Sequence, residues 1–150
     1  MSHLLCSRVL AICVAGALSP AVLATPSGNP PLRDTRWALQ ALDGLPAAAS
    51  DGQPAGHLVL HAASQRLSGF ASCNKLRGRY TQRGTQLALT VVASTRMACP
   101  QMQQEQRFIE LLGAADAYRI EGQVLSLLQG ETVRITFKAI SVKTPASAKK

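Results

Sequence analysis

Alternating apolar and polar residues run through most of the chain and predict short β-strands. In HLVLH, residues 57–61, the leucines fall on one side of an extended segment and the histidines on the other, because successive strand side chains point to opposite faces. Turn-forming pairs such as Asp43-Gly44 separate the segments, as expected for hairpins. The pattern predicts strands at 36–42, 57–61, 65–73, 75–82, 85–92, 118–121, 124–129 and 133–138. A turn is expected over 74–76.

One segment has a helical period instead. In CPQMQQEQRFIELLGAAD the apolar residues recur at helical spacing, Pro100 suits a first turn, and Gly113 suits an end. The spacing predicts a helix from Pro100 to Leu112. Runs of strands with one inserted helix indicate a single α+β domain with a curved, mainly antiparallel sheet, barrel-like and open, of about seven or eight strands. The helix is expected to pack on the apolar face of this sheet.

The two ends of the chain differ from this middle part. Residues 1–24 have the pattern of a cleaved signal peptide, with Arg8 before an apolar run that ends at Ala24. A lipoprotein with Cys13 as its mature N-terminus is the alternative, but too short an apolar region precedes that residue. We therefore expect a periplasmic or secreted protein, with no transmembrane anchor after cleavage, a spacer at 25–34, a domain at 35–139 and a basic, disordered tail at 140–150.

Export changes the reading of the cysteines. Four are present, and cleavage would leave Cys73 and Cys99, which an oxidising compartment would join as a disulfide. A reactive thiol is the alternative, and Cys99 at the helix start is its better candidate. A zinc site would need closely spaced ligand pairs, and a metal site on His57 and His61 has no evident third ligand. We expect no metal and no catalytic centre.

The charge of the chain is positive, with 16 Lys and Arg against 8 Asp and Glu. Within LRGRYTQR the basic residues follow a strand period, so they are expected on a solvent-exposed face. Such a ridge can be an ordinary solvated face or an anion-binding surface. Its candidate residues are Lys75, Arg77, Arg79 and Arg83. Nucleic acid is not expected as a partner, because aromatic residues make up only 4% of the chain.

Two motifs, SGFASCNKLRGRY and ASTRMACPQMQQEQRFIELL, resemble those of the META domain family, also described as HslJ-like, over about Trp37 to Phe137. Matching residues besides the two cysteines include Gly69, Asn74, Gly78, Tyr80, Thr95, Met97, Glu105 and Phe108. The resemblance implies a small α+β domain of the bacterial envelope, associated with heat or antibiotic stress, with no enzymatic activity and no cofactor. Many relatives are lipoproteins. The motif residues are expected to determine the fold, with Glu105 forming hydrogen bonds or charge pairs near the motif loop.

These observations lead to two expectations for function. The first is a monomeric, non-enzymatic accessory protein of the envelope stress response. The alternative is a binding module or inhibitor that acts on an envelope enzyme or an anionic ligand through the basic strand face. Enzymatic activity is the least favoured hypothesis, because the sequence contains no paired active-site motif.

Overall fold

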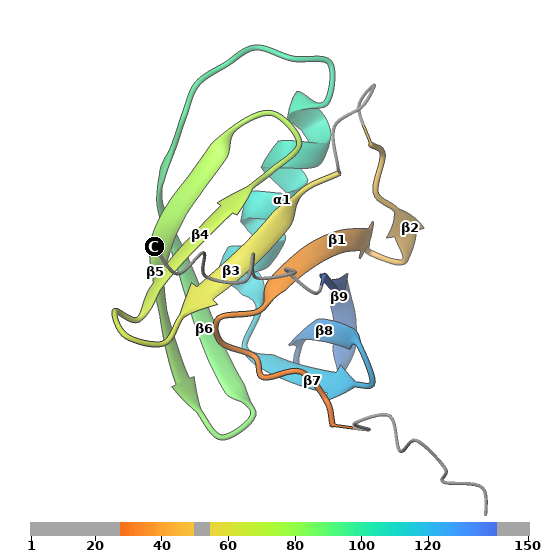
Figure 1. Cartoon of the computed structure of the whole chain (residues 1–150). Helices are drawn as coiled ribbons and strands as arrows, with labels where there is room; N and C mark the ends of the chain where they lie inside the picture. Colours follow the sequence, from red (N-terminus) through yellow and green to blue (C-terminus); the bar gives the residue numbers. More distant parts are fainter. Residues whose placement is uncertain (1–27, 50–54, 141–150) are drawn as a thin grey trace, which may run out of the picture.

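The computed structural model describes residues 28–49 and 55–140, which form a strongly curved antiparallel sheet with one helix (Figure 1). The predicted signal peptide, Cys13 and nearly all of the predicted basic tail lie outside the described residues. The strands are β1 (Arg36–Leu42), β2 (Leu45–Pro46), β3 (His57–His61), β4 (Arg66–Phe70), β5 (Lys75–Arg83), β6 (Gln86–Ser94), β7 (Ala117–Glu121), β8 (Val124–Gln129) and β9 (Thr132–Ile140). The helix is α1 (Met102–Ala114).

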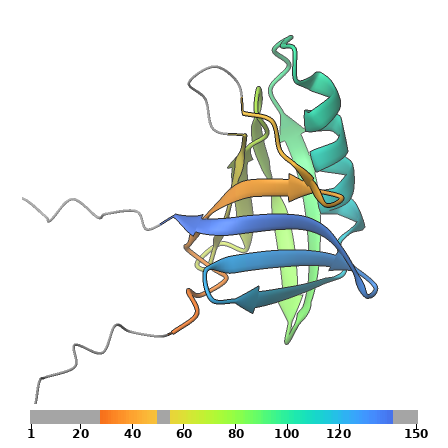
Figure 2. The ribbon, with the colours of Figure 1, turned by 90° about the vertical axis from the view of Figure 1, so that its right-hand side faces the viewer.

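The sheet closes on itself. Its strand order is β2-β1-β3-β4-β5-β6-β7-β8-β9, and β1 also pairs with β9 over much of its length. The strands β7, β8 and β9 run across the direction of β3 to β6, as Figure 2 shows. The predicted α+β class, with one helix on a curved antiparallel sheet, is confirmed, and the β1–β9 ladder closes the barrel further than expected.

The weakest point of the closed sheet lies between β6 and β7, which share a single residue pair, Gln86 with Ala117. The helix follows β6 in the chain and contacts β6 and β9. It begins at Met102 rather than Pro100, because the first intrahelical hydrogen bond runs from the Glu105 N–H to the Gln101 carbonyl. Pro100 and Gln101 form the turn before it.

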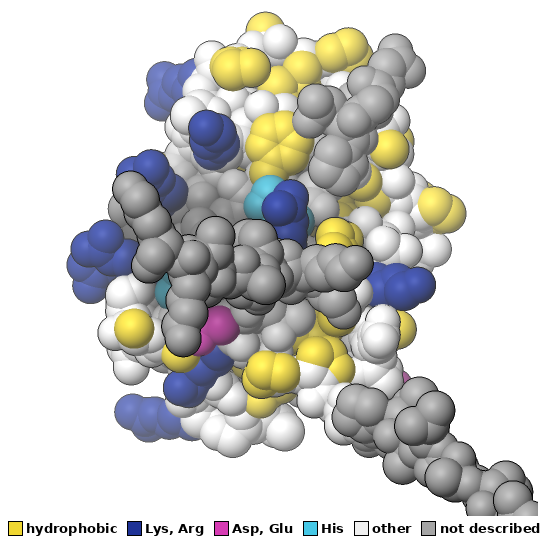
Figure 3. All heavy atoms as spheres, in the orientation of Figure 1, with side chains coloured by type: hydrophobic (Ala, Val, Ile, Leu, Met, Phe, Trp, Pro, Cys, Tyr) yellow, Lys and Arg dark blue, Asp and Glu magenta, His cyan; other side chains and the backbone are white. Residues whose placement is uncertain are grey.

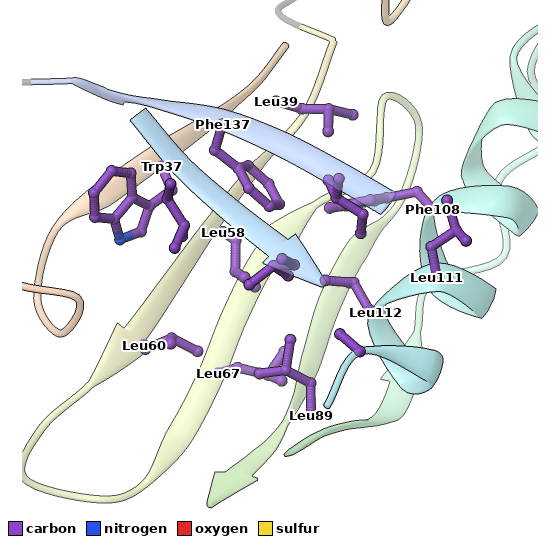
Figure 4. Packing of buried hydrophobic residues seen from close by; sticks show 14 of the residues in the cluster. Trp37, Leu39, Leu58, Leu60, Leu67, Leu89, Phe108, Leu111, Leu112 and Phe137 are labelled. Carbon is purple, nitrogen blue, oxygen red and sulfur yellow. The ribbon is translucent and has the colours of Figure 1, made fainter. Parts of the chain in front are cut away.

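The helix completes the apolar core (Figure 4). Phe108 and Leu112 are fully buried, and the Phe108 ring meets that of Phe137 from β9 edge-on, 6.0 Å between centroids. Strand alternation supplies the facing side chains, such as Leu58 and Leu60 of β3. The core also includes Leu32, whose carbonyl accepts a hydrogen bond from the Trp37 indole, so packed structure begins before the predicted domain start at residue 35.

The first motif, SGFASCNKLRGRY, spans the end of β4, a bend and most of β5. The predicted turn over 74–76 is wrong: the chain bends at Ser72, Cys73 and Asn74, and β5 begins at Lys75. The bend is held by the Ala71 N–H, which donates to the Asn74 carbonyl, and Ser72 adopts a positive φ of 72°. The Asn74 side chain is thereby turned inward, toward the loop between β6 and α1.

Candidate functional site

Asn74 is the centre of a buried hydrogen-bond network between the β4–β5 bend and the helix. Its side chain is 2% exposed. The Nδ2 atom donates to Glu105 Oε1 at 2.8 Å, and the Asn74 backbone N–H donates to Glu105 Oε2 at 3.0 Å. Both carboxylate oxygens of a buried Glu105 are therefore satisfied, which removes most of the cost of burying this side chain. The predicted hydrogen bonding of Glu105 is present.

The same asparagine also fixes the loop between β6 and α1. Its Oδ1 accepts from Thr95 Oγ1 at 2.8 Å and from the Met97 N–H at 2.8 Å, while Nδ2 also donates to the Met97 carbonyl at 3.2 Å. Met97 takes part only through its backbone N–H and carbonyl, and the residue itself is 62% exposed. We call Asn74, Thr95, Met97 and Glu105 the motif network; it uses all the hydrogen-bonding capacity of the Asn74 amide.

A disulfide joins the same two loops. Cys73 and Cys99 are bonded to each other, as predicted from the sequence, with their Cα atoms 6.2 Å apart. Cys73 immediately precedes Asn74, and Cys99 lies just before the helix. Bonded sulfurs are not thiolates, so the reactive-thiol alternative does not hold for this disulfide form.

The motif glycines permit close approach of neighbouring strands. A Cβ atom on Gly69 would lie 2.5 Å from the His57 carbonyl oxygen, and one on Gly78 would lie 2.0 Å from the Thr90 carbonyl oxygen. Real side chains cannot occupy these positions without backbone movement. Tyr80 is buried and donates to the His61 carbonyl at 3.1 Å, so it also stabilises the fold.

The predicted basic ridge lies on the outer side of β5, opposite the side that faces the core. Lys75, Arg77 and Arg79 alternate with buried residues, and these three side chains and Arg83 are exposed. The register places Arg66 of β4 directly opposite Arg79, and it places Arg36 of β1 in the same row as Arg77. We call the surface formed by these side chains of β1, β4 and β5 the basic face, and Figure 3 shows Lys and Arg side chains along this side of the molecule.

Two adjacent hollows lie on the basic face. One, of about 420 Å³, is lined by residues that include Arg66, Arg77 and Arg79. The other, of about 450 Å³, is lined by residues that include Arg36, Lys75 and Arg77. Ser68 and Arg77 border both, so the hollows form one continuous basic surface.

No carboxylate neutralises this surface within the described part of the chain. The ion pairs there connect Asp43 with Arg107 and Arg134, Glu110 with Arg107, and Glu121 with Arg119. None includes a cation of the basic face. In addition, Arg66 and Arg79 are directly opposed across β4 and β5, where like charges destabilise a sheet.

The two histidines of β3 contact polar side chains of this face. Arg36 donates to His57 Nδ1 at 3.2 Å, because an arginine has no acceptor atom. Burial, and then the Arg36 charge, lower the pKa of His57 from its ordinary value of 6.5. His61 Nε2 lies 2.7 Å from Ser68 Oγ. Over residues 28–49 and 55–140 no three His, Cys, Asp or Glu side chains form a metal-binding group.

The ridge on β5 was predicted from the sequence, but the residues beside it were not. These are Arg36, Arg66, Ser68 and Phe70. They belong to other strands, and only the register brings them together. The alternation within each strand was the available signal, since Arg36 and Ser68, like His57, neighbour the apolar positions Trp37, Leu67 and Leu58. Among the described residues, no helix is long and apolar enough to cross a membrane.

Comparisons with known proteins agree with this architecture. An NMR structure of a protein from Burkholderia xenovorans is similar with a TM-score of 0.59 and 25% identity, over 85% of this chain and 99% of that one. A crystal structure of a DUF4847 family protein from Bacteroides vulgatus is similar with a TM-score of 0.56 and 16% identity, over 71% of this chain and 93% of that one. The second likeness concerns the fold alone. No curated protein matches the chain.

The family comparison covers the whole described domain. The META domain matches residues 30–141, from just before Leu32 to just after the end of β9. This span contains the motif network, the disulfide and the basic face. The chain therefore belongs to the META domain family.

Proposed function

We propose that this META domain protein is a non-enzymatic, exported binding protein that assists the bacterial envelope under heat or antibiotic stress. It binds an anionic partner, either an envelope protein or a smaller ligand, through the basic face. The observation that carries the proposal is the set of unneutralised cations around two hollows, with Arg66 and Arg79 directly opposed. Placing like charges opposite each other costs folding energy, and a bound anion would offset this cost.

Binding rather than catalysis is favoured by the surroundings of the nucleophilic side chains. Cys73 and Cys99 are bonded to each other. Ser68 and His61 are close enough for proton transfer, but no described carboxylate is hydrogen-bonded to His61 to orient it. Ser68 also lies inside β4, whose backbone groups are used in ladders with β3 and β5. The backbone there is not available as an oxyanion hole.

Export and the stress role have separate support. Export is supported by the signal-like residues 1–24 and by the disulfide, since disulfides persist in oxidising compartments. The stress role comes from the family resemblance. Intact-mass analysis of the periplasmic fraction would test export: we expect a chain that starts at Thr25, and a diacylated chain that starts at Cys13 would contradict it.

Affinity capture from envelope extract tests binding. The bait proteins are the wild type, a ridge variant (Lys75→Gln, Arg77→Gln and Arg79→Gln) and a control variant (Arg96→Gln, Arg119→Gln and Lys138→Gln). Both variants lose three positive charges, all from exposed side chains. We expect the wild type and the control variant to retain the same partner, with retention falling as salt increases, and the ridge variant to lose it.

Equal capture by all three proteins would contradict the assignment to the basic face. So would capture by the wild type that does not weaken with salt, because an electrostatic surface is screened. A Ser68→Ala variant tests catalysis in parallel. We expect it to retain capture, and a substrate that accumulates uncleaved on this variant alone would overturn the non-enzymatic proposal.

A further inference from the structure

The hollow beside Arg36 has the features of a specific anion site. Arg36, Ser68 and Arg77 lie in one row across β1, β3, β4 and β5, because Arg36 pairs with Val59, Val59 with Ser68, and Ser68 with Arg77. Lys75 lies opposite Phe70 in the next row. Three cations from two separate strands thus border one hollow of about 450 Å³.

Arg36 is held in place without being neutralised. Its guanidinium bonds to the ring of His57, which is stacked against Phe70 with the ring centroids 6.3 Å apart. Its Nε atom is buried and has no hydrogen-bond partner among the described residues. The guanidinium charge is therefore not fully compensated within the fold, and a phosphate that binds the part of Arg36 lining the hollow would supply the missing negative charge.

The geometry points to a phosphomonoester as the ligand of this hollow, with its phosphate bound between Arg36, Lys75 and Arg77 and its organic group against Phe70. This inference rests on the proposed function, because it identifies the anion that the basic face binds. Arginine forks match the oxygen geometry of phosphate, and a dianionic group complements several cations better than a single carboxylate does.

The size and walls of the hollow favour an ester over inorganic phosphate. Its volume lies in the range of sites for small organic molecules and is larger than one phosphate group requires. Phe70 is partly exposed beside His57 and supplies an apolar wall. Ser68 adds a hydroxyl at the border with the second hollow.

Calorimetric titration at low salt tests the site, with phenyl phosphate and inorganic phosphate as probes. We expect saturable binding of phenyl phosphate to the wild type and weaker binding of inorganic phosphate. Arg36→Gln should weaken phenyl phosphate binding about tenfold or more, since it removes a charged donor pair. Arg119→Gln, which removes one exposed cation on β7, should change binding less than about twofold.

Arg36→Lys is a second variant in case Arg36→Gln fails to fold. It keeps the positive charge but lacks the two-pronged guanidinium of arginine. We expect it to unfold at the wild-type temperature and to bind phenyl phosphate more weakly than the wild type. Wild-type affinity in both Arg36 variants would overturn the inference, and so would the absence of saturable binding to the wild-type protein.

Binding to lipid vesicles distinguishes a lipid headgroup from a soluble ester as the source of the phosphomonoester. Binding to phosphatidic acid in phosphatidylcholine vesicles, lost in Arg36→Gln, supports a lipid headgroup, whereas binding of phenyl phosphate alone supports a soluble ester. Both results support the site. If the wild type binds neither probe but the ridge variant still loses its envelope partner, the phosphate site is wrong and the proposed function stands. If capture also fails to depend on the ridge, both are wrong.

Discussion

The motif network and the basic face meet where the bend at Asn74 leads into β5, yet their polar groups have opposite surroundings. Asn74, turned inward, has its whole amide hydrogen-bonded to Glu105, Thr95 and Met97. From Lys75 onward, the outward side chains of β5 make no ion pair with any described carboxylate. Complete satisfaction is typical of a fold determinant, whereas a cluster of exposed, unneutralised cations remains available to bind an anion.

The family motifs of this chain therefore report on its folding more than on its binding surface. The matching residues of this chain lie mainly in the network and the core, so the resemblance reports on folding. The basic face is formed by residues of several strands that the motifs do not single out, apart from those on β5. Substitutions in the two regions should accordingly differ in their effects on stability and on binding.

Removing the centre of the motif network should cost the most stability. Asn74→Ala keeps the backbone donor to Glu105 but removes the Nδ2 donor of its buried carboxylate and the amide bonds to Thr95 and Met97. We expect a loss of about 3–5 kcal/mol in the free energy of unfolding. Urea unfolding measures it. Ser94→Ala is the matched control, because Ser94 Oγ reaches Glu105 only at 3.5 Å, and its cost should be far smaller. Equal losses would show that Asn74 has no special role.

Opening the disulfide should have the next largest effect. The bond closes a loop with a sequence separation of 26, for which loop-closure entropy predicts roughly 3.5 kcal/mol. Cys73→Ser, Cys99→Ser and the double variant should lose similar stability without adding, since each opens the same loop. Peptide mapping without reductant should find the two cysteine peptides joined. Two freely alkylated thiols in exported protein would refute the bond.

A methyl group at Gly78 should have an intermediate effect. Gly78→Ala would force the Thr90 carbonyl away, which we expect to cost about 1–3 kcal/mol. Gly113→Ala is the control, because that position lies in α1 with nothing within 4 Å, and it should stabilise the protein by up to about 1 kcal/mol. Thermal unfolding of both variants measures the contrast. A loss at Gly113 as large as that at Gly78 would contradict the close-approach explanation.

The smallest effect concerns His57 and pH. The folded pKa is lowered below 6.5, so the unfolded chain takes up the proton first and folding stability should fall as the pH drops through about 6.5. His57→Gln removes this group. Between pH 7.5 and 5, the wild type should lose stability relative to the variant, as measured by urea unfolding. A difference that does not change with pH would contradict the lowered pKa of the half-buried His57.

Sequence patterns predicted most of the fold because the periodicity is strong. The leucines of HLVLH and the helical spacing of Phe108 and Leu112 were sufficient to place strands, helix and core. The bend at Ser72 to Asn74 was missed because it depends on hydrogen bonds to Glu105 and Met97, both distant in sequence. The ridge on β5 could be predicted because its basic residues all lie within one strand.

The rest of the basic face could not be predicted for the same reason. Arg36 joins Arg77 only through the pairing of β1, β3, β4 and β5, and no local signal fixes that register. The unsatisfied Nε atom of Arg36 results from its burial in the folded protein, which no local sequence pattern reports.

The free energy of unfolding of the ridge variant shows whether the basic face serves binding and not folding. Solvated charges away from special features change stability by about 0.5 kcal/mol or less each. We therefore predict that the ridge variant unfolds within about 1.5 kcal/mol of the wild type, although it no longer captures its partner. A loss as large as that of Asn74→Ala would show that Lys75, Arg77 and Arg79 are paired within the fold, and it would contradict the account.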